Sequence, residues 1–102
     1  MPSVEQIEKL LEAEPDDAFL NYSLAMALVK EDRINEGLAR FERVFEIDPN
    51  YCAAYYHQGK TYLESERYDE AREILRRGME AAQRAGDGHA QGEMQELSES
   101  IP

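Results

Sequence analysis

An internal repeat constrains this chain more than any other feature of its sequence. Pro15 and Pro49 lie 34 residues apart, and the segments that follow them align without a gap. In this register Tyr22 aligns with Tyr56, and the later positions pair residues of one class: Arg33 with Arg67, Glu36 with Glu70, Phe41 with Leu75, and Phe45 with Met79. A period of this length is typical of arrays in which each structural unit stacks on the next.

The start of the chain matches the second half of the same unit. Its apolar residues and proline, Ile7, Leu10, Leu11 and Pro15, fall on Phe41, Val44, Phe45 and Pro49. We therefore expect one domain, 1–102, built from a half repeat (3–15), a first repeat (16–49), a second repeat (50–85) and a final segment (86–102). A chain of 102 residues has room for one modest core.

The apolar residues recur at intervals of three and four, which predicts helices and no strands. Examples are Val4, Ile7, Leu10 and Leu11, and later Leu38, Phe41, Val44 and Phe45. Six helices are expected. Ser3 and Gln6 form the sequence pattern of a capping box, and Asp16, Asp17 and Asn50 are candidate N-caps after the two prolines.

Small residues recur where two helices must approach closely. Ala25 and Gly59 occupy equivalent places in the first helix of each repeat, and Gly37 and Ala71 do so in the second helix. The final segment follows a turn at Gly86-Asp87-Gly88, and its apolar residues predict a helix with one apolar face: Ala90, Met94, Leu97 and Ile101. We interpret this helix as an acidic cap that covers the end of the array.

These residues resemble the tetratricopeptide repeat family, whose unit also has 34 residues. The second repeat carries Tyr55, Gly59, Tyr62, Ala71, Leu75 and Gly78 of the family pattern, and the first carries Leu24, Ala25, Leu28, Gly37, Phe41 and Pro49. The resemblance covers about residues 3–85. It implies an all-α fold, a short right-handed superhelix of antiparallel helix pairs with a C-terminal capping helix. Departures from the pattern are Asn21, Val44, Gln58 and Gln83.

The resemblance also implies a function, because the first helices of successive repeats line a concave groove in this family. The matching positions are Phe19, Tyr22, Met26 and Val29, then Ala53, Tyr56, Lys60 and Leu63. His57 and Glu64 flank the second set and complete the candidate site. The chain would then be a non-catalytic module that binds a peptide or a partner protein there. The alternative is that helix 18–29 is apolar on nearly every side because it is buried on both sides.

Two further alternatives concern the groove. Lys60 is either a cation that meets a carboxylate or carbonyl of the partner, or an ordinary solvated lysine. Some groove-binding relatives clamp a C-terminal carboxylate with Lys, Asn and Arg, but Tyr22, Met26 and Tyr56 stand at three of those positions. We do not expect binding of that type. A different function, assembly of the chain with its own copies as a homodimer or larger oligomer, also remains open.

Charge narrows the choice of partner. Twenty-two acidic and 11 basic side chains give a formal net charge of −11, which disfavours nucleic acids and anionic membrane surfaces. The acidity is concentrated at the ends, because residues 1–17 hold six acids and one lysine and residues 87–102 hold four acids and no base. A neutral or basic protein or peptide is therefore the expected partner.

No arrangement of residues predicts an enzyme. Cys52 and His57 point about 140° apart on a helix, and His89 and Glu93 lack a third metal ligand. No Lys-Ser or Lys-Thr follows the glycines near residue 88, which excludes a phosphate-binding loop. We expect no catalytic residue, no cofactor and no metal.

The expected cellular location rests on the lack of secretion and membrane signals in the sequence. Cys52 is the single cysteine, the first residues lack a signal-peptide pattern, and no apolar run approaches the ~20 residues that cross a bilayer. These observations favour a cytoplasmic protein. Cys52 opens a helix, where its thiol is either a reactive group or a small spacer.

Overall fold

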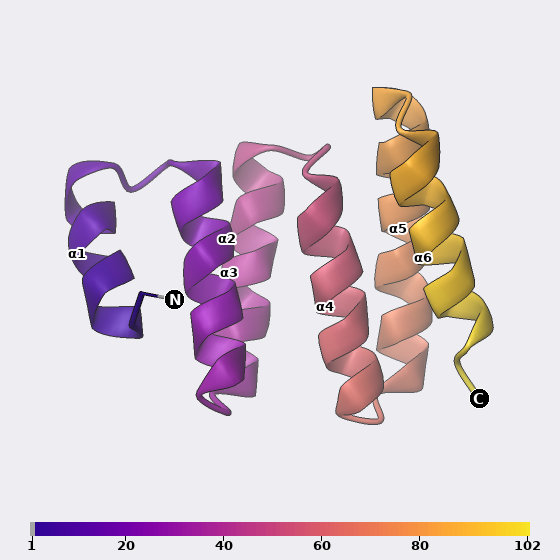
Figure 1. Ribbon diagram of the computed structural model, residues 1–102, viewed down its shortest axis with the longest axis horizontal. Helices are drawn as coiled ribbons and strands as arrows, with labels where there is room; N and C mark the ends of the chain where they lie inside the picture. Colours follow the sequence, from indigo (N-terminus) through magenta and orange to yellow (C-terminus); the bar gives the residue numbers. More distant parts are fainter. Residues whose placement is uncertain (1) are drawn as a thin grey trace. The chain divides into compact units, whose positions relative to one another are not determined.

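The computed structural model describes residues 2–102, and in that range it contains six α-helices and no strand (Figure 1). The all-α prediction and the number of helices are confirmed. The helices are α1 (Val4–Ala13), α2 (Ala18–Lys30), α3 (Ile34–Ile47), α4 (Cys52–Glu64), α5 (Tyr68–Ala85) and α6 (Gly88–Glu99).

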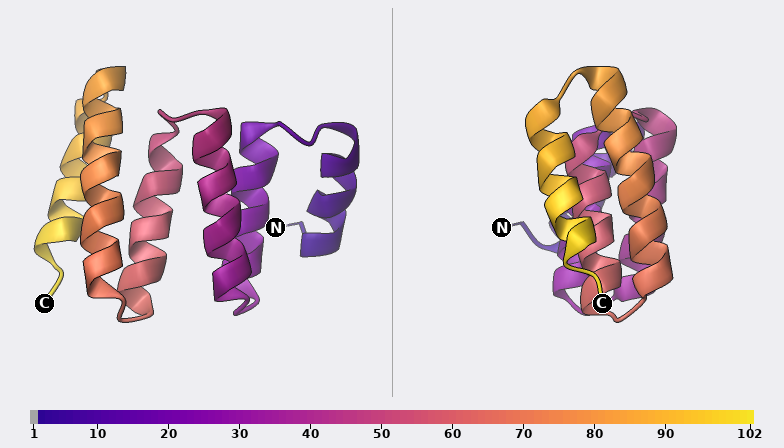
Figure 2. Two further views of the ribbon diagram at one scale, coloured as in Figure 1. Left: turned by 180° about the vertical axis from the view of Figure 1, so that it is seen from behind. Right: turned by 90° about the vertical axis from the view of Figure 1, so that its right-hand side faces the viewer.

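The helices form two compact units, Met1–Pro49 with α1 to α3 (unit 1) and Asn50–Pro102 with α4 to α6 (unit 2). In unit 1, α2 packs against both α1 and α3. In unit 2, α5 packs against α4 and α6, and α6 also contacts α4. Figure 2 shows α5 and α6 side by side from two directions. In unit 1 the middle helix therefore contacts both others, and in unit 2 each helix contacts the other two.

The helix starts follow the sequence signals only in part. The Ser3 and Gln6 capping box forms, with hydrogen bonds of 3.2 Å and 2.8 Å between each backbone N–H and the other side chain. Asp17 caps α2 by accepting a first-turn N–H at 2.8 Å. Asn50 was wrong as a cap, because the N-cap of α4 is Tyr51 and makes no side-chain capping bond.

The turn inside each helix pair uses one left-handed residue. Asp32 has a φ of 63° and Glu66, its equivalent 34 residues later, has a φ of 59°. This conformation lets the chain reverse in a few residues, although a side chain makes it costly. The arginine after each turn pairs with a glutamate three residues later at 2.7 Å, Arg33 with Glu36 and Arg67 with Glu70.

Helices approach closely where the sequence places small residues, as predicted. A Cβ added at Gly37 would lie 3.1 Å from the carbonyl oxygen of Ala25 and 2.7 Å from Cγ2 of Val29. A Cβ added at Gly59 would lie 2.5 Å from Cδ2 of Leu75. Both predicted alanines, Ala25 and Ala71, are completely buried. Any larger side chain at these positions forces the neighbouring helix to move.

Each unit has its own buried apolar residues. In unit 1 a cluster joins α1 to α2 and comprises Val4, Ile7, Leu11, Leu24, Ala27 and Leu28, with Leu20 against it. In unit 2 the buried residues include Tyr55, Ile74, Leu75, Ala81, Ala82 and Met94. Met94 is the buried anchor of α6 and has no exposed surface. The predicted apolar face of this helix therefore packs onto the rest of unit 2.

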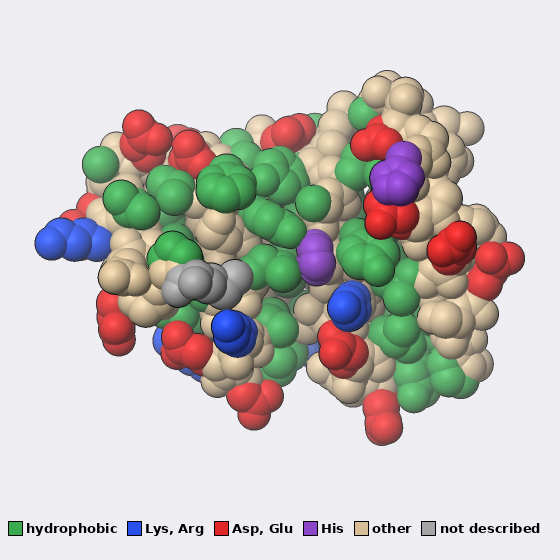
Figure 3. Space-filling model, in the orientation of Figure 1, with side chains coloured by type: hydrophobic (Ala, Val, Ile, Leu, Met, Phe, Trp, Pro, Cys, Tyr) green, Lys and Arg blue, Asp and Glu red, His purple; other side chains and the backbone are tan. Residues whose placement is uncertain are grey.

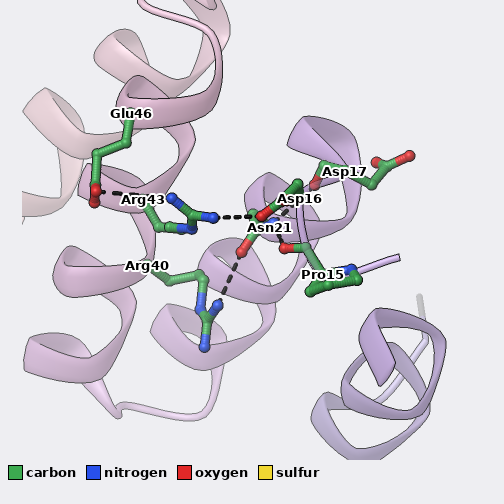
Figure 4. Close-up of polar contacts among 7 residues, drawn as sticks. All are labelled: Pro15, Asp16, Asp17, Asn21, Arg40, Arg43 and Glu46. Atoms are coloured by element: carbon green, nitrogen blue, oxygen red, sulfur yellow. Dashed lines mark hydrogen bonds and ion pairs between the residues drawn. The ribbon is translucent and has the colours of Figure 1, made fainter. Parts of the chain in front are cut away.

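A buried asparagine of α2 links α3 to the turn between α1 and α2 (Figure 4). The side-chain amide of Asn21 donates to the carbonyl oxygens of Pro15 at 3.1 Å and Asp17 at 2.8 Å. Its Oδ1 accepts a hydrogen bond from Arg40 of α3 at 2.8 Å. Asn21 departs from the aromatic residue of the family pattern, and here hydrogen bonds replace the packing of a ring.

We predict that Asn21→Ala lowers the free energy of unfolding by about 1–3 kcal/mol, because it removes one acceptor and two donors from a buried site. Urea unfolding followed by circular dichroism measures this difference. The control is Gln83→Ala, an exposed residue of α5, with an expected change within about 0.5 kcal/mol. Equal stability of the two variants would contradict a structural role for the Asn21 hydrogen bonds.

A second prediction concerns Gly78, which lies in contact with both neighbours of α5. A Cβ there would lie 2.6 Å from Cβ of Tyr55 and would also overlap Sδ of Met94. Gly78→Ala should therefore lower the free energy of unfolding by about 1–3 kcal/mol, through overpacking. Gly92→Ala, where an added Cβ meets nothing within 4 Å, should raise it by about 0.5–1 kcal/mol. Thermal unfolding of both variants tests whether their effects have opposite signs.

Candidate functional site

The described residues offer little for catalysis or metal binding. Residues 2–102 contain no group of three or more His, Cys, Asp and Glu side chains placed to hold a metal ion. His89 and Glu93 pair at 3.4 Å on the surface, and the Sγ of Cys52 lies 3.5 Å from the carbonyl oxygen of Asn50. Over the same range, no helix has the length and apolar character to cross a membrane.

Unit 1 has an apolar pocket of about 400 Å³ between α1 and α2. Its walls are Ile7 and Leu10 from α1 and Phe19, Leu20, Tyr22 and Met26 from α2, with Pro2 and Ser23 at the edges. The volume lies in the range of pockets that hold ligands or anchoring side chains. The α2 residues follow intervals of three and four, so that one helical face supplies most of the wall.

Two large apolar side chains at this pocket are open to solvent. Leu10 is 54% exposed and Phe19 is 63% exposed, and no other large hydrophobic residue of the described chain is as open. Figure 3 shows apolar side chains gathered over α1 and α2 on the face seen there. Because exposed leucine and phenylalanine side chains are costly in water, this surface is the candidate place of contact with another molecule.

The tyrosine of the pocket is held by its aromatic neighbours. The ring of Tyr22 lies 6.4 Å from that of Phe41 in α3 and 6.5 Å from that of Phe19, both in tilted arrangements. These distances are typical of favourable aromatic pairs. Tyr22 therefore connects the buried ring of Phe41 to the exposed ring of Phe19.

Three of the eight residues that line this pocket, Phe19, Tyr22 and Met26, belong to the predicted groove. Val29 does not line the pocket and packs toward Gly37 of α3. The contributions of Ile7, Leu10 and Leu20 were missed. The repeat register could have pointed to Leu10, because it makes Leu10 equivalent to Val44 and Gly78, two positions that face neighbouring helices and are buried.

In unit 2 the predicted binding residues of α4 divide into two groups. Ala53, Tyr56 and His57 line a pocket of about 270 Å³ together with α6 residues that include Glu93 and Met94. The capping helix thus covers part of this face. The remaining predicted residues do not line that pocket: Lys60 and Glu64 are exposed and Leu63 is half-buried.

His57 of this face has a shifted acid-base equilibrium. Burial lowers the pKa of His57, the Lys60 charge acts in the same direction, and Glu93 opposes both. Its ring lies 5.3 Å from that of Tyr56, nearly perpendicular at 87°. A histidine with a lowered pKa is neutral at neutral pH and presents one hydrogen-bond donor and one acceptor.

Comparisons with known proteins agree with this fold. A solved tetratricopeptide repeat domain protein of Salinibacter ruber is 35% identical, over 86% of this chain and 89% of its own, with a TM-score of 0.78. The TPR2B domain of yeast Sti1, solved in complex with pHsp70, is 24% identical over 94% of this chain and 77% of its own, with a TM-score of 0.86.

A third solved structure is YrrB, described as a TPR protein with an unusual peptide-binding site. It is 20% identical over 95% of this chain and 58% of its own, with a TM-score of 0.70. The search of curated proteins finds no match. A family model, Tetratricopeptide repeat, matches residues 28–92, which is more than half of the sequence. The chain therefore belongs to the tetratricopeptide repeat family.

Proposed function

We propose that this protein is a non-catalytic interaction module that binds a segment of another protein. The observation that carries the proposal is the apolar pocket of unit 1, with Leu10 and Phe19 open to solvent at its edge. Contact with an apolar side chain of a partner would remove this surface from water, at about 25 cal/mol for each Å² buried. A few such anchors supply most of the affinity in protein interfaces.

Structural relatives support binding of a polypeptide. The Sti1 domain was solved with pHsp70, and YrrB is described as having a peptide-binding site. Their identity to this chain is 24% and 20%, so they share its fold and do not specify its partner. The binding residues that we propose are those of the predicted groove: Phe19, Tyr22, Met26, Val29, Ala53, Tyr56, His57, Lys60, Leu63 and Glu64.

Charge distinguishes a foreign partner from a second copy of this chain. Each copy carries a formal net charge of −11, so two copies repel one another before their apolar surfaces meet. A neutral or basic segment avoids that repulsion, and a basic one is attracted. We therefore favour a foreign protein over self-assembly as the occupant.

Affinity capture with matched variants tests this function. The intact chain, Phe19→Asp and Gln83→Asp are each immobilised and exposed to a native lysate, after circular dichroism has shown that all three are folded. Both substitutions add one negative charge at an exposed residue, but only Phe19 lines the pocket. We expect one protein to be captured by the intact chain and by Gln83→Asp, with about tenfold less on Phe19→Asp.

Direct titration of the captured protein then measures the affinity of each variant. Equal capture by all three would contradict a role for the pocket. Absence of any specific protein, with a discrete dimer mass by light scattering, would instead establish self-assembly as the function.

A further inference from the structure

Three arginines line a groove of about 330 Å³ in unit 1, on the side of α2 that faces away from the apolar pocket. Its walls come from α1 and α3, which in the described chain both pack on α2 and not on each other. Leu24 and Leu28 of α2 form its floor and are almost completely buried. Because each residue of a helix turns by about 100°, these leucines point nearly opposite to Tyr22 and Met26 of the apolar pocket. The two concave surfaces are therefore separate.

Two of the three arginines already bind carboxylates of this chain. Arg33 holds Glu36 through its Nε and Nη2, at 2.7 Å and 2.9 Å. Arg43 pairs with Asp16, in the turn that precedes α2. The third arginine, Arg40 of α3, is half-buried and lines the same groove. Its charge is therefore the one that needs an account.

Arg40 is held in place by a neutral group. Its Nη1 donates to Oδ1 of Asn21 at 2.8 Å, and Figure 4 shows the side chain reaching from α3 toward this residue of α2. Within residues 2–102, its Nε and Nη2 donate to no group and no carboxylate forms an ion pair with it. The bond to Asn21 thus orients the guanidinium group and leaves one edge of it without an acceptor in the described chain.

The same edge of the guanidinium group binds glutamate elsewhere in this protein. Arg67 holds Glu70 through Nε and Nη2 at 2.8 Å and 2.7 Å, as Arg33 holds Glu36. These two parallel N–H groups match the two oxygens of a carboxylate. Glu36 lies one helical turn before Arg40 but is bound to Arg33. The edge formed by Nε and Nη2 of Arg40 therefore fits a carboxylate that the described chain does not supply.

We propose that this groove binds the side-chain carboxylate of a glutamate from a partner protein, held by Nε and Nη2 of Arg40. The two methylene groups of the glutamate would lie on Leu24 and Leu28. The source is a protein because hydrogen bonds to one charged group hold a free acid only weakly, with a Kd on the order of 10–100 mM. Other contacts of the partner supply the remaining affinity. The inference rests on the proposed function only in taking a protein as the partner, since its site lies on the other face of α2.

Charge around the groove specifies how the partner presents this glutamate. Glu8 of α1 is an exposed acid that lines the groove together with Arg40, and the whole chain carries a formal net charge of −11. A segment with many acids would be repelled, so the bound glutamate stands alone in a neutral or basic segment. Arg40 then selects, among such segments, those that carry one acid at the matching place.

Butanoate reproduces the side chain of glutamate and is the probe for this site. It is titrated at constant ionic strength into the full chain, labelled with ¹⁵N and with ¹³C in the leucine methyl groups. The signals to follow are the Nε–H of Arg40 and the methyl groups of Leu24 and Leu28. We expect saturable shifts with a Kd on the order of 10–100 mM. Butanamide, the uncharged analogue, should cause none.

Three variants that each change one charge assign the binding to Arg40. Arg40→Gln should abolish the saturable shifts, whereas Arg84→Gln, at an exposed arginine of α5, should leave them unchanged. Glu8→Gln removes a negative charge that lines the groove and should strengthen butanoate binding about twofold to threefold. A gain in binding cannot arise from damage to the fold. Circular dichroism checks the fold of Arg40→Gln, which also loses the bond to Asn21.

Affinity capture then establishes whether the carboxylate belongs to a protein. The partner captured by the intact chain should be retained equally by Arg84→Gln and about tenfold less by Arg40→Gln, because only the second loses the charge-assisted hydrogen bonds. The apolar pocket is tested separately by Phe19→Asp, so failure at one site does not decide the other.

Two results would overturn the inference. The first is that butanoate causes no saturable shift at Arg40, or that chloride at the same ionic strength causes the same shifts, which would show general screening of charge. The second is that butanoate binds at Arg40 while Arg40→Gln and Arg84→Gln capture the partner equally. That result would make a free organic acid the ligand of the groove.

Discussion

A helix pair with apolar residues on two faces needs a neighbour on each side, and the rest of this structure follows from that need. The small residues of the two repeats let the paired helices approach closely, which exposes the outer face of each second helix to the next element. In unit 2 that element is α6, whose Met94 is completely buried and contacts Gly78. In unit 1 the corresponding element beside α1 is α2, and the candidate binding pocket lies between these two helices.

Much of the fold could be predicted because the 34-residue period and the helical spacing of apolar residues indicate the same buried face on each helix. The positions of Ala25, Gly37, Gly59 and Ala71 indicated the close contacts correctly, since only small residues permit them. The roles of Asn50 and Asn21 could not be predicted in this way. The hydrogen bonds of Asn21 depend on the positions of backbone carbonyls and of an arginine from another helix. The N-cap of α4 likewise depends on the local backbone. These positions are set by the folded structure and are not visible in the spacing of residues.

The candidate site was predicted less completely than the fold, for a related physical reason. Periodicity identifies the apolar face of a helix, but the exposure of that face depends on neighbours far along the chain. Phe19, Tyr22 and Met26 line one pocket because one face of α2 carries them all. Leu10 was assigned to the helix pattern alone, although it is 54% exposed and lines the pocket. Tyr56 and His57, by contrast, are partly covered by α6.

The first helix of unit 1 and the last helix of unit 2 expose different kinds of side chain. Unit 2 finishes with α6, which buries its one apolar anchor and turns Glu93, Glu96 and Glu99 toward water. Unit 1 begins with α1, which keeps an apolar side chain in the open. The apolar surface of α1 favours contact with another apolar surface, whereas the carboxylates of α6 favour contact with water.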